Sequence, residues 1–165
     1  MQEPTFSVRD LASRLALCGM IAPPEALPFM FGNTPELAQK LASLVAQGRK
    51  TATAGLLWAW KADDGGPPKV GQIYIVHNWE GAPLAVIENT QVSIVPFHLV
   101  DAQFASEEGE GDLSLAWWRR AHWDYFSTEC QRLGRAPSED MPVVCQRFRI
   151  LYPPAATTVS REHYP

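Results

Sequence analysis

A short junction at residues 48–53 constrains the fold of this chain most, because a helical pattern ends there and an extended pattern begins. Upstream, leucines recur at helical spacing behind Thr34, a residue suited to the N-cap of a helix. Gly48 suits the left-handed position that follows a helix. Downstream, threonines alternate with other residues, which is typical of a strand. The chain is therefore predicted to contain a helix that ends just before Gly48 and a strand that follows at once.

The same junction gathers two cations and two hydroxyls, in Arg49, Lys50, Thr51 and Thr53. Because side chains alternate along an extended chain, we expect both threonines on one face and Lys50 on the other, flanking one small pocket. A purely structural interpretation is also open, since cations favour the end of a helix and threonine is common in strands. Functional residues often lie at the ends of such elements, so the junction is a candidate site.

Length and composition place the chain among globular proteins. Its 165 residues are 46% hydrophobic and 19% charged, which is enough to bury the core of one domain without disulfides. No apolar run reaches the length of a membrane span, and the start of the chain lacks a basic segment followed by an apolar stretch. We therefore expect a cytoplasmic protein with no membrane partner. Composition leaves its oligomeric state open.

Charge and potential metal ligands exclude further classes of function. The net charge of −4 argues against a protein that coats nucleic acid by bulk electrostatics. The three cysteines are widely spaced, as expected of reduced thiols, and the four histidines show no ligand spacing. We therefore predict no metal site and no cofactor, and any contact with nucleic acid has to be local.

Prolines divide the chain into three parts. Residues 1–28 are predicted to be an appendage, with a short helix near residues 8–17 and a proline-marked linker. The domain is predicted at residues 29–152, and residues 153–165 are predicted to be a disordered tail.

Two antiparallel strands are predicted at residues 70–78 and 84–95, because each has a face of alternating aliphatic residues. Before them, the apolar run 56–60 is predicted to prolong the strand that follows Gly48. Residues 63–68 are predicted to form a surface loop. Glu88 interrupts the aliphatic row of the second strand. Such an acid either pairs with an arginine or faces a site where the interior opens to solvent.

The second half of the chain is predicted to be mainly helical. A short helix near residues 98–104 leads into a flexible acidic loop at 106–112, and Asp112 is expected to cap a long helix over residues 113–133. Residues 141–152 are predicted to form the last strand. Histidine and arginine are the notable polar residues of the long helix. His122 lies at the edge of an apolar stripe, where a histidine is more often a core residue than a catalyst.

Four separated motifs of this chain resemble those of the ASCH family, named for activating signal cointegrator homology, and the resemblance spans about residues 29–152. The motifs are GRKTAT at residues 48–53, VGQ at 70–72, EGEGD at 108–112 and WRRAHW at 118–123. Each is weak alone, but together they follow the order and spacing of the family.

The resemblance implies an α+β fold, a small PUA-like β-barrel flanked by helices, with a cleft for RNA or a nucleoside. Some relatives cleave single-stranded RNA, some hydrolyse the amide of acylated cytidine, and others are thought only to bind RNA. Because a shared fold does not decide the chemistry, all three activities stay open. A ribonuclease acting on single-stranded RNA is our first prediction, with the amidohydrolase and a non-catalytic RNA-binding module as alternatives.

The resemblance also assigns catalytic roles to residues. Lys50 matches the family lysine, Thr53 matches the nucleophile of the amidohydrolase members, and the loop acid of the family falls on Glu108 or Glu110. Ser127 matches a serine implicated in the ribonuclease members. The tyrosine that those ribonucleases use before the GRKT motif is absent from this chain.

Each mechanism uses these residues differently. In RNA cleavage, Lys50 would neutralise phosphate charge, an acid or His122 would carry the proton, and Ser127 would bind a phosphate oxygen. In amide hydrolysis, Thr53 would be activated by a lysine with a lowered pKa or by a loop glutamate. The residues predicted to bind substrate are Arg49, Thr51, Glu88, Arg119, Arg120 and His122.

Overall fold

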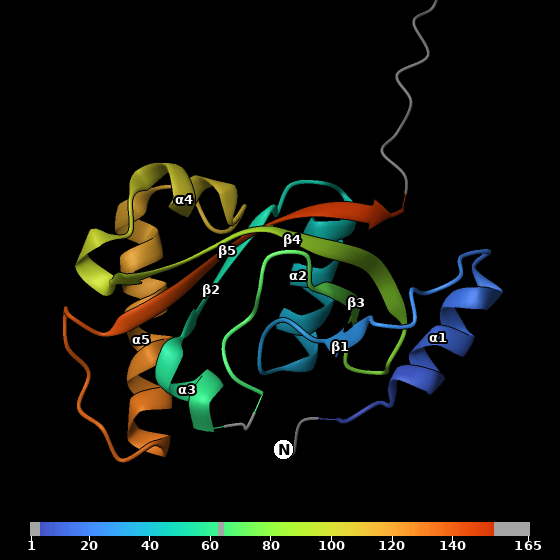
Figure 1. Ribbon diagram of the computed structural model, residues 1–165. Coiled ribbons are helices and arrows are strands. Elements are labelled where there is room, and N and C mark those ends of the chain that lie inside the picture. Colours follow the sequence, from blue (N-terminus) through green and yellow to red (C-terminus); the bar gives the residue numbers. More distant parts are fainter. Residues whose placement is uncertain (1–3, 63–64, 154–165) are drawn as a thin grey trace, which may run out of the picture.

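The computed structural model describes residues 4–62 and 65–153, and its centre is a mixed sheet of order β1-β3-β4-β5-β2. β1 runs parallel to β3, and the other neighbours are antiparallel. The strands are β1 (Leu27–Phe29), β2 (Ala52–Leu56), β3 (Ile73–His77), β4 (Pro83–Pro96) and β5 (Pro142–Tyr152). The sheet curves into a half-barrel that stays open between its edge strands, β1 and β2 (Figure 1). The predicted α+β class and barrel-like sheet are thus confirmed.

Helices cover both faces of this sheet. α2 (Pro35–Ala46) packs on β3, β4 and β5 through a cluster that includes Leu41 and Val45. α1 (Val8–Leu17) packs on the same strands with Leu11 and Leu15 against Ile75. Because both faces of β4 are buried, three successive residues of that strand, at positions 85–87, lie in the interior. The predicted pairing of β3 and β4 is confirmed.

A third core cluster lies where α4 (Ala102–Glu107) and α5 (Leu115–Arg132) pack on β2 and β5. Trp118 and Phe126 of α5 are buried there with Phe97 of the 3₁₀ helix η1 (Phe97–Leu99). In Figure 1, α5 and α1 lie at opposite ends of the molecule. No helix of residues 4–62 and 65–153 is long and apolar enough to cross a membrane.

The N-terminal segment is joined to the domain by packing and by the sheet. β1 pairs with β3, and Leu11 and Leu15 are fully buried. The predicted helix near residues 8–17 is therefore present, and it contributes to the core. That residues 29–152 fold without this segment stays a prediction. Residues 154–165 of the predicted tail lie outside the described part of the chain.

Three details of the predicted elements are wrong. The run after Leu56 is not a strand but the helix α3 (Leu57–Ala62). In a helix, Trp58 and Trp60 lie on opposite sides, so Trp58 packs on the core and Trp60 does not, whereas a strand would direct both to one face. Ser114, not Asp112, is the N-cap of α5. The acidic stretch is not a flexible loop, since it includes the end of α4 and a buried glutamate. The loop expected at 63–68 includes two residues, 63 and 64, outside the described residues.

Candidate functional site

A cavity of about 950 Å³ lies between α5 and the elements that precede it in the chain. We call it the Lys50 cavity. It is lined by residues 29–32, Leu37 and Leu41 of α2, Lys50, residues 53–56 of β2, Ala59 and Trp60 of α3, Glu108, Glu110, Thr5, and Trp117, Ala121, His122, Tyr125, Glu129 and Arg132 of α5. Five predicted site residues thus share one cavity: Lys50, Thr53, Glu108, Glu110 and His122.

The end of α2 turns Lys50 inward. Gly48 adopts a φ of 73°, which glycine tolerates and which ends the helix. The backbone N–H groups of Arg49 and Lys50 then both donate to the carbonyl of Leu44, so the chain folds back over the last helical turn. Lys50 is 1% exposed as a result. Lys50 precedes β2, so its position is set by this turn and not by the strand.

The acidic stretch is held against this turn by direct backbone contact. The N–H of Thr51 donates to the carbonyl of Glu107 over 2.9 Å. Gly109 has a φ of 71°, and a Cβ there would lie 2.3 Å from the carbonyl oxygen of Arg49. Only glycine meets both demands, so residues 108–110 lie directly beside Lys50.

The Lys50 ammonium binds three oxygen atoms. Its Nζ lies 2.8 Å from Oε2 of Glu108, 2.7 Å from Oε1 of Glu110 and 3.4 Å from the backbone carbonyl oxygen of Glu108. Since an ammonium has three N–H donors, all of them are directed at acceptors. Phe31 lies beneath this cluster, with its ring centroid 5.5 Å from Nζ.

The second carboxylate oxygen of Glu108 is bound from α5. Trp118 Nε1 donates to Oε1 over 2.8 Å, and His122 Nε2 lies 3.3 Å from the same oxygen. His122 Nδ1 lies 3.0 Å from the carbonyl oxygen of Trp118, and the two rings stack with centroids 4.1 Å apart. Glu108 is therefore fixed at both oxygens and is 1% exposed.

These contacts fix the charges of the pair. Burial alone would raise the pKa of the Glu108 carboxyl, but the Lys50 ammonium and His122 outweigh burial and lower that pKa to about 2. Burial would also lower the pKa of the Lys50 amine, but the Glu108 and Glu110 carboxylates outweigh it, so the pKa of Lys50 is raised. At neutral pH Lys50 is a cation, and the expected lysine of lowered pKa is not found.

Thr53 and Glu110 are less constrained than the buried pair. Thr53 lines the cavity from β2, and within the described residues its hydroxyl forms no hydrogen bond. Glu110 contacts Lys50 through one oxygen, and its side chain is 15% exposed. The Thr53 hydroxyl and the partly exposed Glu110 carboxylate thus lie in the same cavity as the buried Lys50 cation.

The family model of the ASCH domain matches residues 28–152. The chain belongs to the ASCH family. A crystal structure of an ASCH domain from Lactobacillus crispatus JV V101 is similar to it, with a TM-score of 0.75 and 34% identity over 86% of this chain and 92% of that one. A crystal structure of a protein from Enterococcus faecalis V583 has a TM-score of 0.75 and 30% identity, over 96% of this chain and 97% of that one. None of the curated proteins matches.

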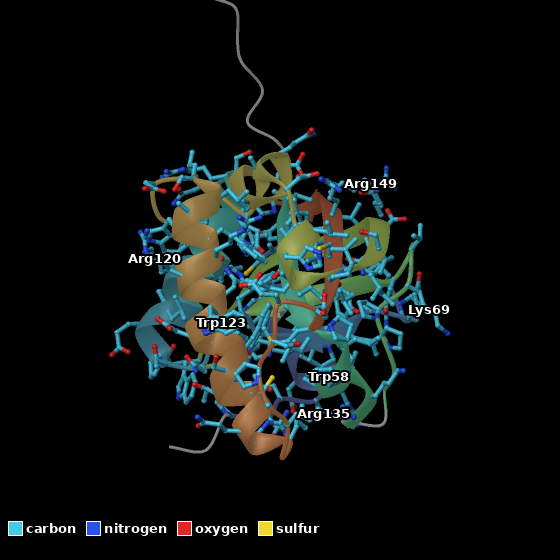
Figure 2. All side chains as sticks on the ribbon, turned by 90° about the vertical axis from the view of Figure 1, so that its left-hand side faces the viewer. Trp58, Lys69, Arg120, Trp123, Arg135 and Arg149 are labelled. Atoms are coloured by element: carbon cyan, nitrogen blue, oxygen red, sulfur yellow. The ribbon has the colours of Figure 1, made fainter. Side chains whose placement is uncertain are left out.

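All three predicted substrate-binding arginines lie outside the Lys50 cavity of this ASCH domain. Arg119 and Arg120 line a separate depression of about 340 Å³ together with Trp123, and Arg119 donates to the carbonyl of His98. Trp123 packs against Phe97 of the core, and Figure 2 shows Arg120 at the outer edge of the molecule beside α5. Arg49 is exposed and does not line the cavity either.

Thr51 and Glu88, which were also predicted to bind substrate, do not line the cavity. The Thr51 hydroxyl lies 3.3 Å from the carbonyl oxygen of Glu107, where it supports the acidic stretch. Glu88 pairs with Arg149, as the structural interpretation of that acid anticipated. Arg149 lies on the surface in Figure 2. The expectation that Glu88 lines the cleft is wrong, because Glu88 of β4 faces Arg149 of β5 and does not line the cavity.

Ser127 faces away from the cavity. Residues of a helix advance by about 100° each, and the cavity-lining positions Trp117, Ala121 and Tyr125 share one side of α5. Ser127 falls on the opposite side, with Arg120. Its hydroxyl oxygen is buried and has no hydrogen-bond partner within the described residues. A direct role for Ser127 in this cavity is therefore excluded by its position.

Of the aromatic wall of the cavity, the sequence pointed only to Trp60, as one of three tryptophans, with Trp58 and Trp79, that could stack on a base in an RNA-binding module. Phe29 and Phe31 precede α2, Trp60 belongs to a helix where a strand was expected, and Trp117 and Tyr125 line α5. For Phe29, Phe31, Trp117 and Tyr125 the sequence carries no signal of this role. Among the described residues, no group of three or more His, Cys, Asp or Glu side chains could hold a metal ion.

Proposed function

We propose that the Lys50 cavity binds an acylated nucleoside, such as cytidine acylated on its exocyclic amine, and hydrolyses the amide. The observation that carries this proposal is the presence of Lys50, Thr53 and Glu110 on the wall of one cavity. These three are a fixed cation, a hydroxyl that forms no hydrogen bond within residues 4–62 and 65–153, and a carboxylate with partial access to solvent. Acyl transfer needs such groups as its oxyanion stabiliser, its nucleophile and its proton carrier.

The charge of the cavity favours a neutral substrate over a phosphate chain. Its charged lining comprises the cations Lys50 and Arg132 and the acids Glu108, Glu110 and Glu129. Acids therefore outnumber cations, which disfavours a polyanion. A nucleoside carries no phosphate, and the aromatic wall offers its base a surface for stacking.

In the proposed first step, the Thr53 oxygen attacks the carbonyl carbon of the amide and its proton passes to the Glu110 carboxylate. The negative charge that develops on the carbonyl oxygen is stabilised by the Lys50 ammonium. When Glu110 accepts the proton, it loses its charge and releases one N–H of Lys50 for this oxygen. The C–N bond then breaks, and Glu110 returns the proton to the departing amine.

The second step regenerates the enzyme. Water attacks the acyl ester on Thr53 and gives its proton to Glu110, the ester C–O bond breaks, and Thr53 recovers a proton as the carboxylic acid leaves. Glu108 takes no part in proton transfer in this proposal, since its pKa of about 2 keeps it ionised and both of its oxygens are bound. Its function is to hold Lys50. This assigns the acid–base role of the family's loop acid to Glu110.

The ribonuclease prediction keeps Lys50 and its candidate proton carriers, Glu110 and His122, but loses the serine and the two arginines of α5. Ser127 lies on the opposite side of α5 from the cavity, and Arg119 and Arg120 line another depression. We therefore place amide hydrolysis ahead of RNA cleavage.

The test is to offer purified protein acetylated cytidine and single-stranded RNA, and to identify the products by chromatography. We expect release of acetate and cytidine, with turnover reduced at least a thousandfold by Thr53→Ala, consistent with the loss of a nucleophile (roughly 10³-fold or more). Ser127→Ala is the matched control and should retain turnover. RNA cleavage that depends on Ser127, with no release of acetate, would contradict the proposal.

A further inference from the structure

Trp60 occupies a place on the cavity wall that the strand β2 leaves open for it. A Cβ on Gly55 would lie 2.9 Å from Trp60 Nε1 and 3.7 Å from Cδ1 and Cε2. The φ of Gly55 is outside the left-handed region, so the backbone does not require glycine there. What requires it is the space that the indole occupies.

The same strand carries the proposed nucleophile. Thr53 and Gly55 are two residues apart on β2, so they lie on the same face of the strand, about 7 Å apart. Both line the Lys50 cavity. The indole of Trp60, seated over Gly55, therefore lies on the same side of the strand as Thr53, two residues away.

Other aromatic rings fix the indole and connect it with the charged cluster. The rings of Phe29 and Trp60 are nearly parallel, with an interplanar angle of 18° and centroids 6.4 Å apart. Phe29 is held in turn by Phe31 at 4.8 Å and Tyr74 at 5.1 Å. Since Phe31 lies beneath Lys50, the aromatic wall is continuous from the cation to Trp60.

Its neighbour on α3 shows that Trp60 has a different role from a core residue. Trp58 packs against the core cluster of β2 and α5 and lies 4.5 Å from the guanidinium of Arg135 (Figure 2). Trp60 is half-buried and faces the cavity. A large aromatic side chain whose face borders a cavity is suited to stack on a base.

We infer that Trp60, seated over Gly55, is the platform on which the planar base of the substrate stacks, and that this stacking places the acylated exocyclic nitrogen over Thr53. The inference rests on the proposed function and adds its specificity: the ligand must carry a flat, aromatic base. A saturated ring is puckered and loses contact with the indole. The platform should therefore distinguish cytidine from 5,6-dihydrocytidine.

The experiment measures the dissociation constants of cytidine and 5,6-dihydrocytidine by calorimetry for the full chain and its variants. Wild type should prefer cytidine by roughly tenfold, within the range expected for one stacked base. Trp60→Leu should abolish this preference, and Trp60→Phe should restore most of it. Gly55→Ala should reduce it, because the new methyl group displaces the indole. Trp79→Leu, at a half-buried tryptophan outside the cavity, is the control and should retain it.

The outcomes separate this inference from the proposed function. If wild type hydrolyses acetylated cytidine but Trp60→Leu keeps the preference for the planar ring, the platform is wrong and the function stands. If wild type prefers cytidine through Trp60 without hydrolysing the amide, the platform stands and the catalytic proposal fails. If wild type binds neither nucleoside, the platform is overturned, and the function is overturned with it when wild type also releases no acetate from acetylated cytidine.

Discussion

Nζ of Lys50 lies 2.8 Å from Oε2 of Glu108, and each of the two side chains is only 1% exposed. A buried ion pair of this kind is costly to desolvate, and it is maintained only where further hydrogen bonds complete it. Trp118 and His122 supply those bonds to Glu108, and Glu110 supplies one more acceptor to Lys50. The pair therefore behaves as one unit with α5, and it fixes a cation at the wall of the cavity.

Removing the charge of Glu108 should destabilise the fold. Glu108→Gln keeps the shape of the side chain but leaves Lys50 with a single carboxylate, so we expect a loss of roughly 3 kcal/mol in the free energy of unfolding. Glu88→Gln is the matched control, because Glu88 pairs with the largely exposed Arg149 and should cost less than about 1 kcal/mol. Urea denaturation measures both. Equal losses in the two variants would show that the buried pair has no special weight.

The same pair predicts how stability depends on pH. The pKa of Glu108 is about 2 in the folded protein and 4.5 ordinarily, so its contribution is complete above pH 4.5 and is lost as the pH falls towards 2. This shift corresponds to roughly 3 kcal/mol. The pKa of Lys50 is raised, so its contribution is complete below pH 10.5 and is lost only as the pH rises through its folded value.

Denaturation curves of wild type and Glu108→Gln at several pH values check the acidic limb. The difference in stability between the two proteins should be constant from pH 5 to 7 and should shrink between pH 4.5 and 2. A difference that stays constant down to pH 2 would mean that Glu108 titrates normally.

Gly109 should be far less replaceable than Gly48. Both have a positive φ, of 71° and 73°, so alanine strains the backbone at either site by roughly 1–2 kcal/mol. A Cβ at Gly109 also meets the carbonyl of Arg49, whereas nothing lies within 4 Å of a Cβ at Gly48. We therefore expect Gly109→Ala to lower the free energy of unfolding by about 1–3 kcal/mol more than Gly48→Ala does. Thermal unfolding of both variants measures the difference, and similar transition temperatures would exclude the close approach.

The pattern of the sequence predicted much of the fold because local signals and tertiary packing agree there. Thr34 and Gly48 bound α2 as expected, and β3 and β4 pair as their aliphatic alternation indicated. The run after Leu56 was predicted wrongly, since leucine and tryptophan suit both a strand and a helix. In the structure, Trp58 packs on the core and Trp60 lines the cavity, which requires a helix. The residues near them in the sequence do not show these two different environments.

The candidate site was predictable in part for a similar reason. Lys50, Thr53 and the loop acids follow from a motif, and the structure brings them to one cavity. The two acids could not be distinguished in the sequence, because only the packing of α5 fixes Glu108 and leaves Glu110 accessible. Ser127 matched a motif position, but its direction depends on which side of α5 faces the cavity. That side is set by packing far along the chain.

The N-terminal segment should contribute to stability although the family model begins at residue 28. Leu11 and Leu15 are fully buried against the sheet, so we expect Leu15→Ala to lower the free energy of unfolding by about 2–5 kcal/mol. Removal of residues 1–28 should lower stability further, since it also removes two of the three residues of β1. Leu17→Ala is the control, because Leu17 is 89% exposed. A truncated domain as stable as the full chain would show that the segment is an appendage.

The central claim is that Thr53 carries the acyl group during amide hydrolysis, and intact-peptide mass spectrometry tests it most directly. The protein is mixed with acetylated cytidine, quenched in acid within its first turnovers, digested and analysed. The account predicts an acetyl group on Thr53 of the wild type and none in Thr53→Ala. In Glu110→Gln the acetyl group should form more slowly but also persist longer, because the water that removes it has lost its proton acceptor. Release of acetate without any acetyl group on Thr53, and with Thr53→Ala fully active, would contradict the account.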